Sequence, residues 1–236
     1  MYLLYRHPLR GGKVNAMEAG KDEELSMGEK ALFIEHPTDT SNRVKVSQLQ
    51  PSQLPQADPA KIPYTVCGPY LKELFDRAFI DGLHNPNLRP TANEWEDALL
   101  KTVDLVQPCQ NPKCWHKWFV FDNTTRPRCP FCETDYKGQL PVLNLYSPRH
   151  QGTFTPDNYR LMVYNNQYLY PWHVNRHIWP NERLSDEDKK PVGYFVFHQN
   201  KWLLVNQRLT DLEDKTEGKK IGIKEAVELT DNKQIL

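Results

Sequence analysis

Four cysteines are the residues of this sequence whose type and spacing are best suited to chemistry. They form two close pairs, C-x4-C and C-x2-C, separated by fourteen residues: Cys109, Cys114, Cys129 and Cys132. Thiolate sulfur is a preferred ligand of zinc. Two such pairs on either side of a short hairpin are typical of a zinc ribbon, in which each pair lies on a tight turn. The spacing therefore predicts that four sulfurs converge tetrahedrally on one zinc ion.

The predicted zinc site is structural, because four thiolates leave no open coordination position for a catalytic water. A module of about thirty residues cannot build a hydrophobic core, so the metal would supply its folding free energy. His116 could replace one ligand, although four cysteines already suffice. The alternative is that the cysteines are reduced structural residues or the remains of an eroded site. Cys67 stands alone and is expected to be a free thiol.

The composition limits the classes to which the chain can belong. Its 236 residues include 30 Lys+Arg and 30 Asp+Glu, so the formal net charge is zero, which argues against a strongly basic nucleic-acid binder. No run of about 18 apolar residues predicts a membrane span. The first residues lack the basic region and the cleavage site of a secretory signal. We therefore expect a cytoplasmic chain without a membrane partner, whose cysteines are metal ligands or free thiols.

The charges around the cysteines distinguish two roles for the zinc ribbon. Five basic residues stand against three acidic ones, and this net charge of +2 is small for binding nucleic acid. We therefore favour a rigid spacer between two folded parts over a nucleic-acid-binding module. The basic residues are Lys113, Lys117, Arg126, Arg128 and Lys137, and the acidic residues are Asp122, Glu133 and Asp135.

The elements that must position this module divide the chain into residues 1–107, 108–138 and 139–236. The first part is helical after an irregular start, in which GGKVNAMEAGKDEEL is expected to be a loop. Apolar residues at helical spacing in GPYLKELFDRAFIDGL predict one helix, with Gly82 as its end signal. Thr91 and Glu94 form a capping box that begins a second helix. Its expected apolar stripe is Trp95, Leu99, Thr102, Val103 and Val106.

The third part contains short β-type runs separated by turn residues, which predict a small antiparallel β-sandwich. The runs are 140–146, 159–164, 168–170, 192–197, 202–206 and 226–229. With the helices of the first part, the predicted fold class is α+β.

The third part also holds the residues that we consider for partner binding. A dense polar and aromatic cluster runs from Trp172 to Trp179, and a phosphopeptide reader would need arginines and amide donors on its loops. The candidates are Trp172, His173, Arg176, Arg183 and Asn206. The alternative, which we favour, is that the Trp and His side chains pack in the sandwich with satisfied hydrogen bonds.

Two segments of the first part resemble the C-terminal end of a eukaryotic-type protein kinase domain: LLYRHPLRGG at 3–12 and PNLRPTA at 86–92, with Trp95. The combination of GEKALFIEHPTDTSNR, GPYLKELFDRAFIDGL and RPTANEWEDAL is more specific. It resembles bacterial Ser/Thr kinase-like proteins of tellurite-resistance-type stress clusters. The resemblance implies a kinase C-lobe remnant, then a zinc module, then a β-sandwich similar to a forkhead-associated domain. It also implies a von Willebrand-type protein and a PPM-type phosphatase as neighbours in such systems.

The sequence departs from that family where the chemistry lies. Phosphoryl transfer needs a glycine-rich loop, a strand lysine, an HRD-type loop and a DFG-type metal ligand, and none is found here. We therefore expect no ATP binding and no kinase activity from this chain. By the resemblance, Arg89, together with the structural residues Thr91 and Trp95, belongs to the last kinase subdomain, where the arginine pairs with a buried glutamate of an APE motif. No APE occurs, so either Arg89 finds another acid or water, or a missing kinase portion supplies the partner; we favour the second.

Three hypotheses follow for function. The leading one is a non-catalytic regulatory or interaction segment of a kinase-like protein in stress signalling, whose partners are the missing kinase portion and a protein such as a phosphoprotein. The second is the truncated end of an active Ser/Thr kinase. The third, from another class, is a zinc-ribbon nucleic-acid-binding module.

Overall fold

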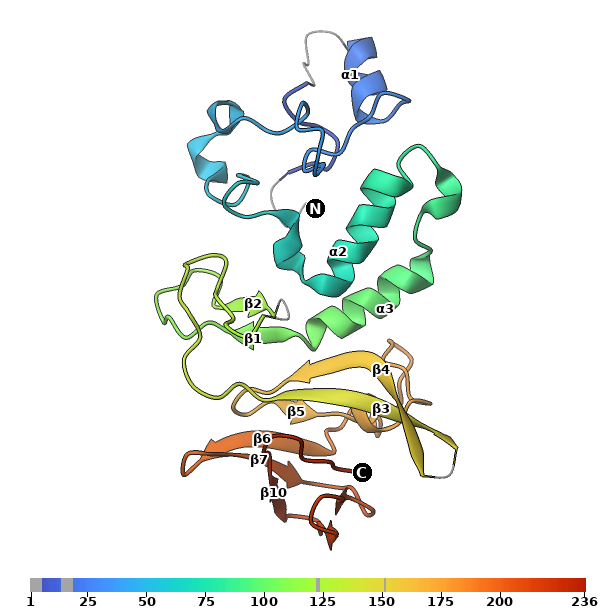
Figure 1. Cartoon of the computed structure of the whole chain (residues 1–236), viewed down its shortest axis with the longest axis vertical. Helices are drawn as coiled ribbons and strands as arrows, with labels where there is room; N and C mark the ends of the chain where they lie inside the picture. The colour runs from blue at the N-terminus through green and yellow to red at the C-terminus, as the bar shows by residue number, and fades with distance from the viewer. Residues whose placement is uncertain (1–5, 14–18, 122–123, 151) are drawn as a thin grey trace. The chain divides into compact units, whose positions relative to one another are not determined.

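The computed structural model describes residues 6–13, 19–121, 124–150 and 152–236 (Figure 1). The chain forms two compact units, Met1–Lys137 and Gly138–Leu236. The helical segment and the cysteine module therefore belong to the same unit. Helices and antiparallel strands each make up 22% of the chain, so the predicted α+β class is confirmed. None of the helices within the described ranges combines the length and apolar character that crossing a bilayer requires.

The described residues of the first unit form three α-helices and several short helical turns. The helices are α1 (Ala19–Ser26), α2 (Pro69–Asp76) and α3 (Ala92–Val103). Single turns of 3-10 helix lie at Val46–Gln48, Pro51–Gln53, Tyr64–Cys67 and Pro86–Leu88. The first helix corrects the expected loop, since the charged segment AGKDEELS is helical.

The predicted helix over 68–83 is present but is not uniform. After α2 the chain continues as one π-helical turn, Arg77–Asp81, and Gly82 ends it as expected. At the other end Gly68 precedes α2 with φ +91, where a Cβ would lie 2.5 Å from Val120 Cγ1. Only glycine meets both demands without strain. Gly68 therefore allows α2 to begin directly against the cysteine module.

Arg89 caps the end of this helical segment. Its Nε donates to the carbonyl oxygen of Gly82 at 2.7 Å, and its Nη2 donates to that of Leu83 at 2.8 Å. A cation at the carbonyl end of a helix is favourable for the helix dipole. Arg89 is exposed, and its bonds to backbone oxygens are an arrangement beside the two that we considered, an acid or water in this chain and a missing kinase portion.

The capping box that begins α3 is confirmed. The amide of Thr91 donates to Glu94 Oε2 at 2.7 Å, and the amide of Glu94 donates to Thr91 Oγ1 at 3.3 Å. A hydrogen bond from Arg77, together with those from Thr91, lowers the pKa of Glu94 to about 2. Trp95 then packs on Phe75 with ring centroids 5.3 Å apart.

The expected apolar stripe of α3 is wrong at three positions, since Val106 lies beyond the end of the helix, in strand β1 (Val106–Pro108). Leu99 is 51% exposed and Val103 is 67% exposed, whereas Ala98 and Thr102 are buried. The Thr102 hydroxyl donates to the Ala98 carbonyl at 2.6 Å, which satisfies it inside the helix. Small side chains on the inner face let α3 approach the rest of the core closely, and this turns the larger apolar residues outward.

A buried ion pair joins three segments of the first unit. Arg6 and Glu35 have side chains only 2% and 6% exposed, with Arg6 Nη2 2.6 Å from Glu35 Oε1. Arg6 also donates to the carbonyl oxygens of Gln56 at 3.0 Å and Ile62 at 2.7 Å. The second carboxylate oxygen of Glu35 accepts the Tyr64 amide at 2.8 Å. These hydrogen bonds offset part of the desolvation of both charges, and burial still raises the pKa of Glu35.

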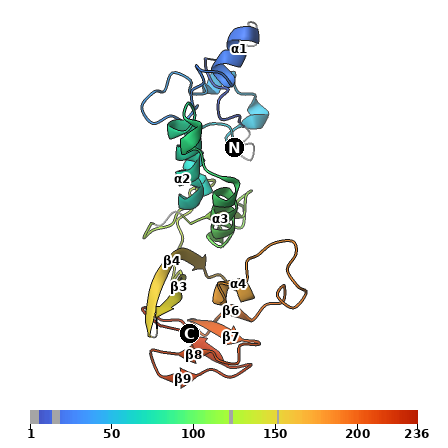
Figure 2. The ribbon, with the colours of Figure 1, turned by 90° about the vertical axis from the view of Figure 1, so that its right-hand side faces the viewer.

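The second unit is built on a four-stranded antiparallel sheet of order β10-β7-β6-β5. Each predicted β-type run contains a strand, and the hairpin β8–β9 is an addition. The strands are β3 (Val142–His150), β4 (Thr153–Met162), β5 (Tyr168–Leu169), β6 (Gly193–His198), β7 (Lys201–Asn206), β8 (Glu213–Asp214), β9 (Lys219–Lys220) and β10 (Ala226–Glu228). Figure 2 shows the short helix α4 (Pro171–Val174) close to this sheet.

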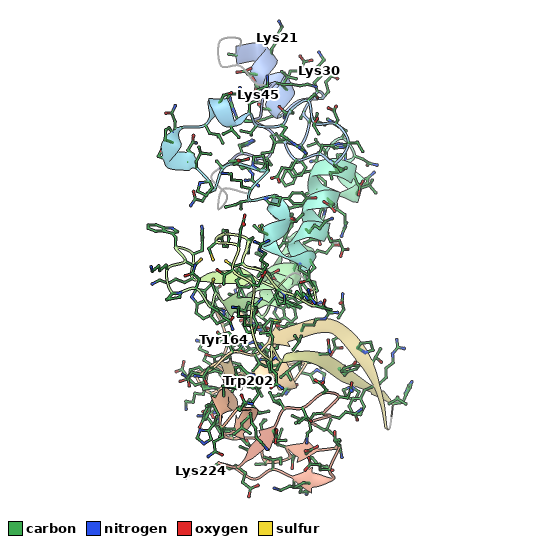
Figure 3. All side chains as sticks on the ribbon, turned by 60° about the vertical axis from the view of Figure 1, so that its left-hand side comes forward. Lys21, Lys30, Lys45, Tyr164, Trp202 and Lys224 are labelled. Atoms are coloured by element: carbon green, nitrogen blue, oxygen red, sulfur yellow. The ribbon has the colours of Figure 1, made fainter. Side chains whose placement is uncertain are left out.

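One face of the sheet forms the core of the second unit. Phe195 pairs with Leu204, and Leu204 pairs with Val227, so the three buried side chains share a face. Leu161 and Val163, at the end of β4 and just after it, pack into the same cluster. Trp202, labelled in Figure 3, closes the cluster and donates its Nε1 hydrogen to the Gln139 carbonyl at 3.3 Å.

We predict that Glu35→Gln destabilises the first unit by about 3 kcal/mol, because it leaves the buried Arg6 guanidinium without a counter-charge. Asp97→Asn, in the more exposed i,i+4 pair with Lys101, is the control and should cost less than about 1 kcal/mol. Urea unfolding measures both. Equal effects would show that the buried pair is not a main stabilising contact.

Candidate metal centre

Short antiparallel strands position the first cysteine pair. β1 (Val106–Pro108) pairs with β2 (Trp118–Val120), with Gln107 opposite Phe119. Cys109 follows β1 directly, and its amide donates to the Lys117 carbonyl at 2.7 Å, which extends the ladder. The Cys114 amide then donates to the Asn111 carbonyl at 3.0 Å and closes a turn. The pair therefore lies on a tight turn, as its spacing predicts.

A second turn of similar form carries the other pair. The Cys129 amide donates to the Thr134 carbonyl, and the Glu133 amide donates back to the Cys129 carbonyl, each at 2.9 Å. Arg128 lies beside this turn, with Nη2 3.2 Å from a Glu133 carboxylate oxygen and Nε 3.6 Å from one of Asp135. Glu133 has φ +59, a left-handed conformation that lets the chain reverse sharply after Cys132.

The two turns bring four sulfur atoms together. All four Sγ atoms lie within 4.8 Å of one another, with 3.5 Å between Cys109 and Cys132 and 3.8 Å between Cys114 and Cys129. A tetrahedron with metal–sulfur bonds of about 2.3 Å has edges of about 3.8 Å. A disulfide would need about 2.05 Å, and all four cysteines are free. The quartet can therefore hold one metal ion.

The four sulfurs of the quartet differ in how readily they ionise. Burial raises the pKa of Cys129 to about 12 and also raises the pKa of Cys109. Burial opposes ionisation at Cys132 as well, yet hydrogen bonds with Thr134 lower its pKa to about 6. Backbone amides of Asn111 and Phe131 point at the sulfurs of Cys109 and Cys129 and stabilise their charged forms. A cation would let all four sulfurs ionise together.

His116 and Cys67 are not part of the quartet. The His116 ring stacks on Phe131 with centroids 3.7 Å apart and an interplanar angle of 20°, and burial lowers the pKa of the imidazole. Cys67 lies among the partly buried residues that pack on the helical core, where burial raises the pKa of its thiol. His116 therefore covers Phe131, which itself packs on the cysteine cluster.

The residues that we considered for partner binding are distributed differently in the second unit. Trp172 stacks on Tyr170 at 4.4 Å, and His173 is buried with Nδ1 accepting the Tyr170 amide at 3.1 Å. Asn206 is 1% exposed, and its Nδ2 donates to the Leu209 and Ile221 carbonyls. Arg176 and Arg183 are exposed. Of the five residues, these two arginines are the ones that present charge to solvent.

Sequence reasoning missed a pair of contacts that closes the module. Gln110 Nε2 donates to the Lys137 carbonyl, and the Lys137 amide donates to Gln110 Oε1, both at 2.7 Å. This reciprocal pair joins the residue after the first ligand to a residue five positions after the last one. No local pattern signals it, because a glutamine in a turn has many other partners available.

Comparison of the chain with protein-family models, with curated proteins and with solved structures finds no match.

We predict that Cys129→Ser abolishes stoichiometric metal binding, because it removes a buried ligand from the closed quartet. Cys67→Ser is the matched control and should leave the metal content unchanged. Elemental analysis of the two purified variants measures this. Equal metal content in both would mean that the ion binds elsewhere.

Proposed function

We propose that Cys109, Cys114, Cys129 and Cys132 bind one structural zinc ion in a zinc ribbon. Convergence of four sulfurs at tetrahedral spacing is the observation that carries the proposal. An all-sulfur donor set favours zinc or iron among abundant metals, and zinc needs no redox role or open position. Two turns joined by a short β-pair are also the local architecture that such ribbons use.

The metal would give the module its folding free energy. The strands β1 and β2 have three residues each, and the local cluster contains Phe119 with the cysteines and Phe131, which is little apolar burial for an independent fold. Through Gly68 and Val120 the module also touches the beginning of α2. Loss of zinc would therefore loosen the helical part as well as the ribbon.

The function of the chain, in our proposal, is that of a non-catalytic regulatory or interaction segment of a bacterial Ser/Thr kinase-like protein in stress signalling. Support comes from the resemblance of residues 3–12, 28–43, 68–83 and 86–99 to the end of such kinases, and from the lack of ATP-binding motifs. The helical part would be a kinase C-lobe remnant and the second unit an FHA-like interaction domain. Reduced thiolates at the quartet suit a cytoplasmic location.

The partner in this proposal is a protein, such as the remaining kinase portion or a phosphoprotein. Arg176 and Arg183 are exposed and are suited to an anionic group, since guanidinium forks bind phosphate. Asn206 has its Nδ2 and Oδ1 engaged with backbone in the interior, so a phosphopeptide site would rely on the arginines.

We expect about one zinc per chain in protein purified without added metal. Acidification should release it, because protons compete with the metal for the sulfur ligands. Elemental analysis across a pH series measures both. Finding iron in place of zinc would change the assignment of the metal. Less than a tenth of an equivalent of any metal per chain would contradict the zinc-ribbon proposal.

ATP with magnesium should leave the melting temperature unchanged, because a ligand stabilises only a protein that binds it. Zinc-loaded protein is the sample, and a thermal scan with millimolar nucleotide is the measurement. A rise of several degrees would contradict the non-catalytic assignment.

A further inference from the structure

The loop between the first cysteine pair and β2 presents a tryptophan to solvent. Side chains alternate along it: Cys114 is buried and His116 is half-buried, whereas Lys113, Trp115 and Lys117 are exposed. Trp115 is 86% exposed, which makes it the most exposed large apolar side chain in the described ranges. Solvent-exposed tryptophan without a structural partner is a recurrent feature of recognition surfaces.

The outward direction of Trp115 is imposed by its neighbours. On one side, Cys114 is fixed in the sulfur quartet, and on the other, His116 is stacked on Phe131. Lys117 is held by its carbonyl bond to the Cys109 amide and has φ +60. The three exposed side chains, here called the Lys113–Trp115–Lys117 ridge, are therefore carried by a loop that is anchored on both sides.

Some charged side chains of the cysteine module form ion pairs with one another, and others do not. Arg128 pairs with both Glu133 and Asp135, so these acids are already engaged with a cation. Lys113 and Lys117 have no acidic partner among the described residues of the chain. Two of the three acidic residues of the module are thus engaged with Arg128, and the third, Asp122, lies outside the described residues. The net charge of the segment therefore understates the positive charge that the ridge presents.

We propose that the Lys113–Trp115–Lys117 ridge binds single-stranded nucleic acid, with a base stacked on the indole of Trp115 and the two ammonium groups at adjacent phosphates. Stacking platforms flanked by cations are how proteins bind single strands without sequence preference. An acidic peptide would satisfy the lysines but would leave both faces of the indole uncovered, whereas a nucleotide supplies charge and a flat ring together. The proposal rests on the zinc site, because Cys114 holds the loop.

The test uses the full chain, with zinc content measured on the same sample. Fluorescence anisotropy of a labelled twelve-nucleotide single-stranded DNA gives the Kd at 50 and 200 mM salt. Trp115→Ala should weaken binding about tenfold or more, as loss of one stacked base requires. Lys113→Gln with Lys117→Gln should weaken it and reduce the salt slope by about 1.4, the share of two phosphate contacts.

Matched controls come from the second unit. Trp179→Ala removes another exposed tryptophan, and Lys224→Gln removes an exposed lysine labelled in Figure 3. Both should leave the Kd within about twofold.

Weaker binding in the ridge variants alone, with full zinc content, supports the proposal. Full zinc content without DNA binding at 50 mM salt overturns the proposal for the Lys113–Trp115–Lys117 ridge, while the proposal of a zinc site stands. Binding that Trp115→Ala leaves unchanged, or stronger competition by an acidic peptide than by unlabelled DNA, also overturns it. A wild-type sample without metal that does not bind overturns both proposals, and the metal analysis identifies that case.

Discussion

Mutual repulsion among four sulfur atoms is the constraint on which the cysteine module depends. Thiolates within 4.8 Å of one another cannot all carry charge unless a cation lies between them, and as thiols they would leave polar sulfur packed in a small space. The two turns and the three-residue strands position the four sulfurs, and His116 stacks on Phe131 beside them. In the zinc ribbon that we propose, neutralising charge at one position would therefore organise some thirty residues that have little apolar surface to bury.

A second electrostatic contact stabilises the helical part, and it joins opposite charges rather than like ones. Arg6 and Glu35 provide their own compensation, with backbone carbonyls and the Tyr64 amide completing the set. A fully ionised quartet would need a cation from outside, while the Arg6–Glu35 pair has both of its charges within the chain. Because Val120 of the module lies against Gly68 at the beginning of α2, the two systems share one packed unit and their stabilities are coupled.

Sequence patterns predicted those features that depend on residues close together in the chain. The spacing of the cysteines indicated the quartet, Thr91 and Glu94 indicated the beginning of α3, and short β-type runs between turn residues indicated β6 and β7, because each signal lies within a few residues. Leu99 and Val103 were misplaced because the buried face of a helix is decided by what packs on it. The Arg6–Glu35 pair, 29 residues apart in sequence, and the carbonyl contacts of Arg89 have no periodic signal at all. A sequence pattern also does not show which charged side chains form ion pairs. The net charge of the module therefore gave no sign of the two exposed lysines beside Trp115.

The reciprocal bonds between Gln110 and Lys137 have a mechanical consequence. Lys137 is the last residue of the first unit, so tension that arrives along the chain from Gly138 first meets two amide hydrogen bonds. They join Lys137 to the residue beside the first ligand, and the segment between Cys132 and Lys137 lies inside the closed loop. A pull on the chain therefore loads the two bonds to Gln110 before it acts on the turn that carries Cys129 and Cys132. With a metal ion bound, as we propose, Gln110 would keep such a pull from changing the distances between the sulfur ligands.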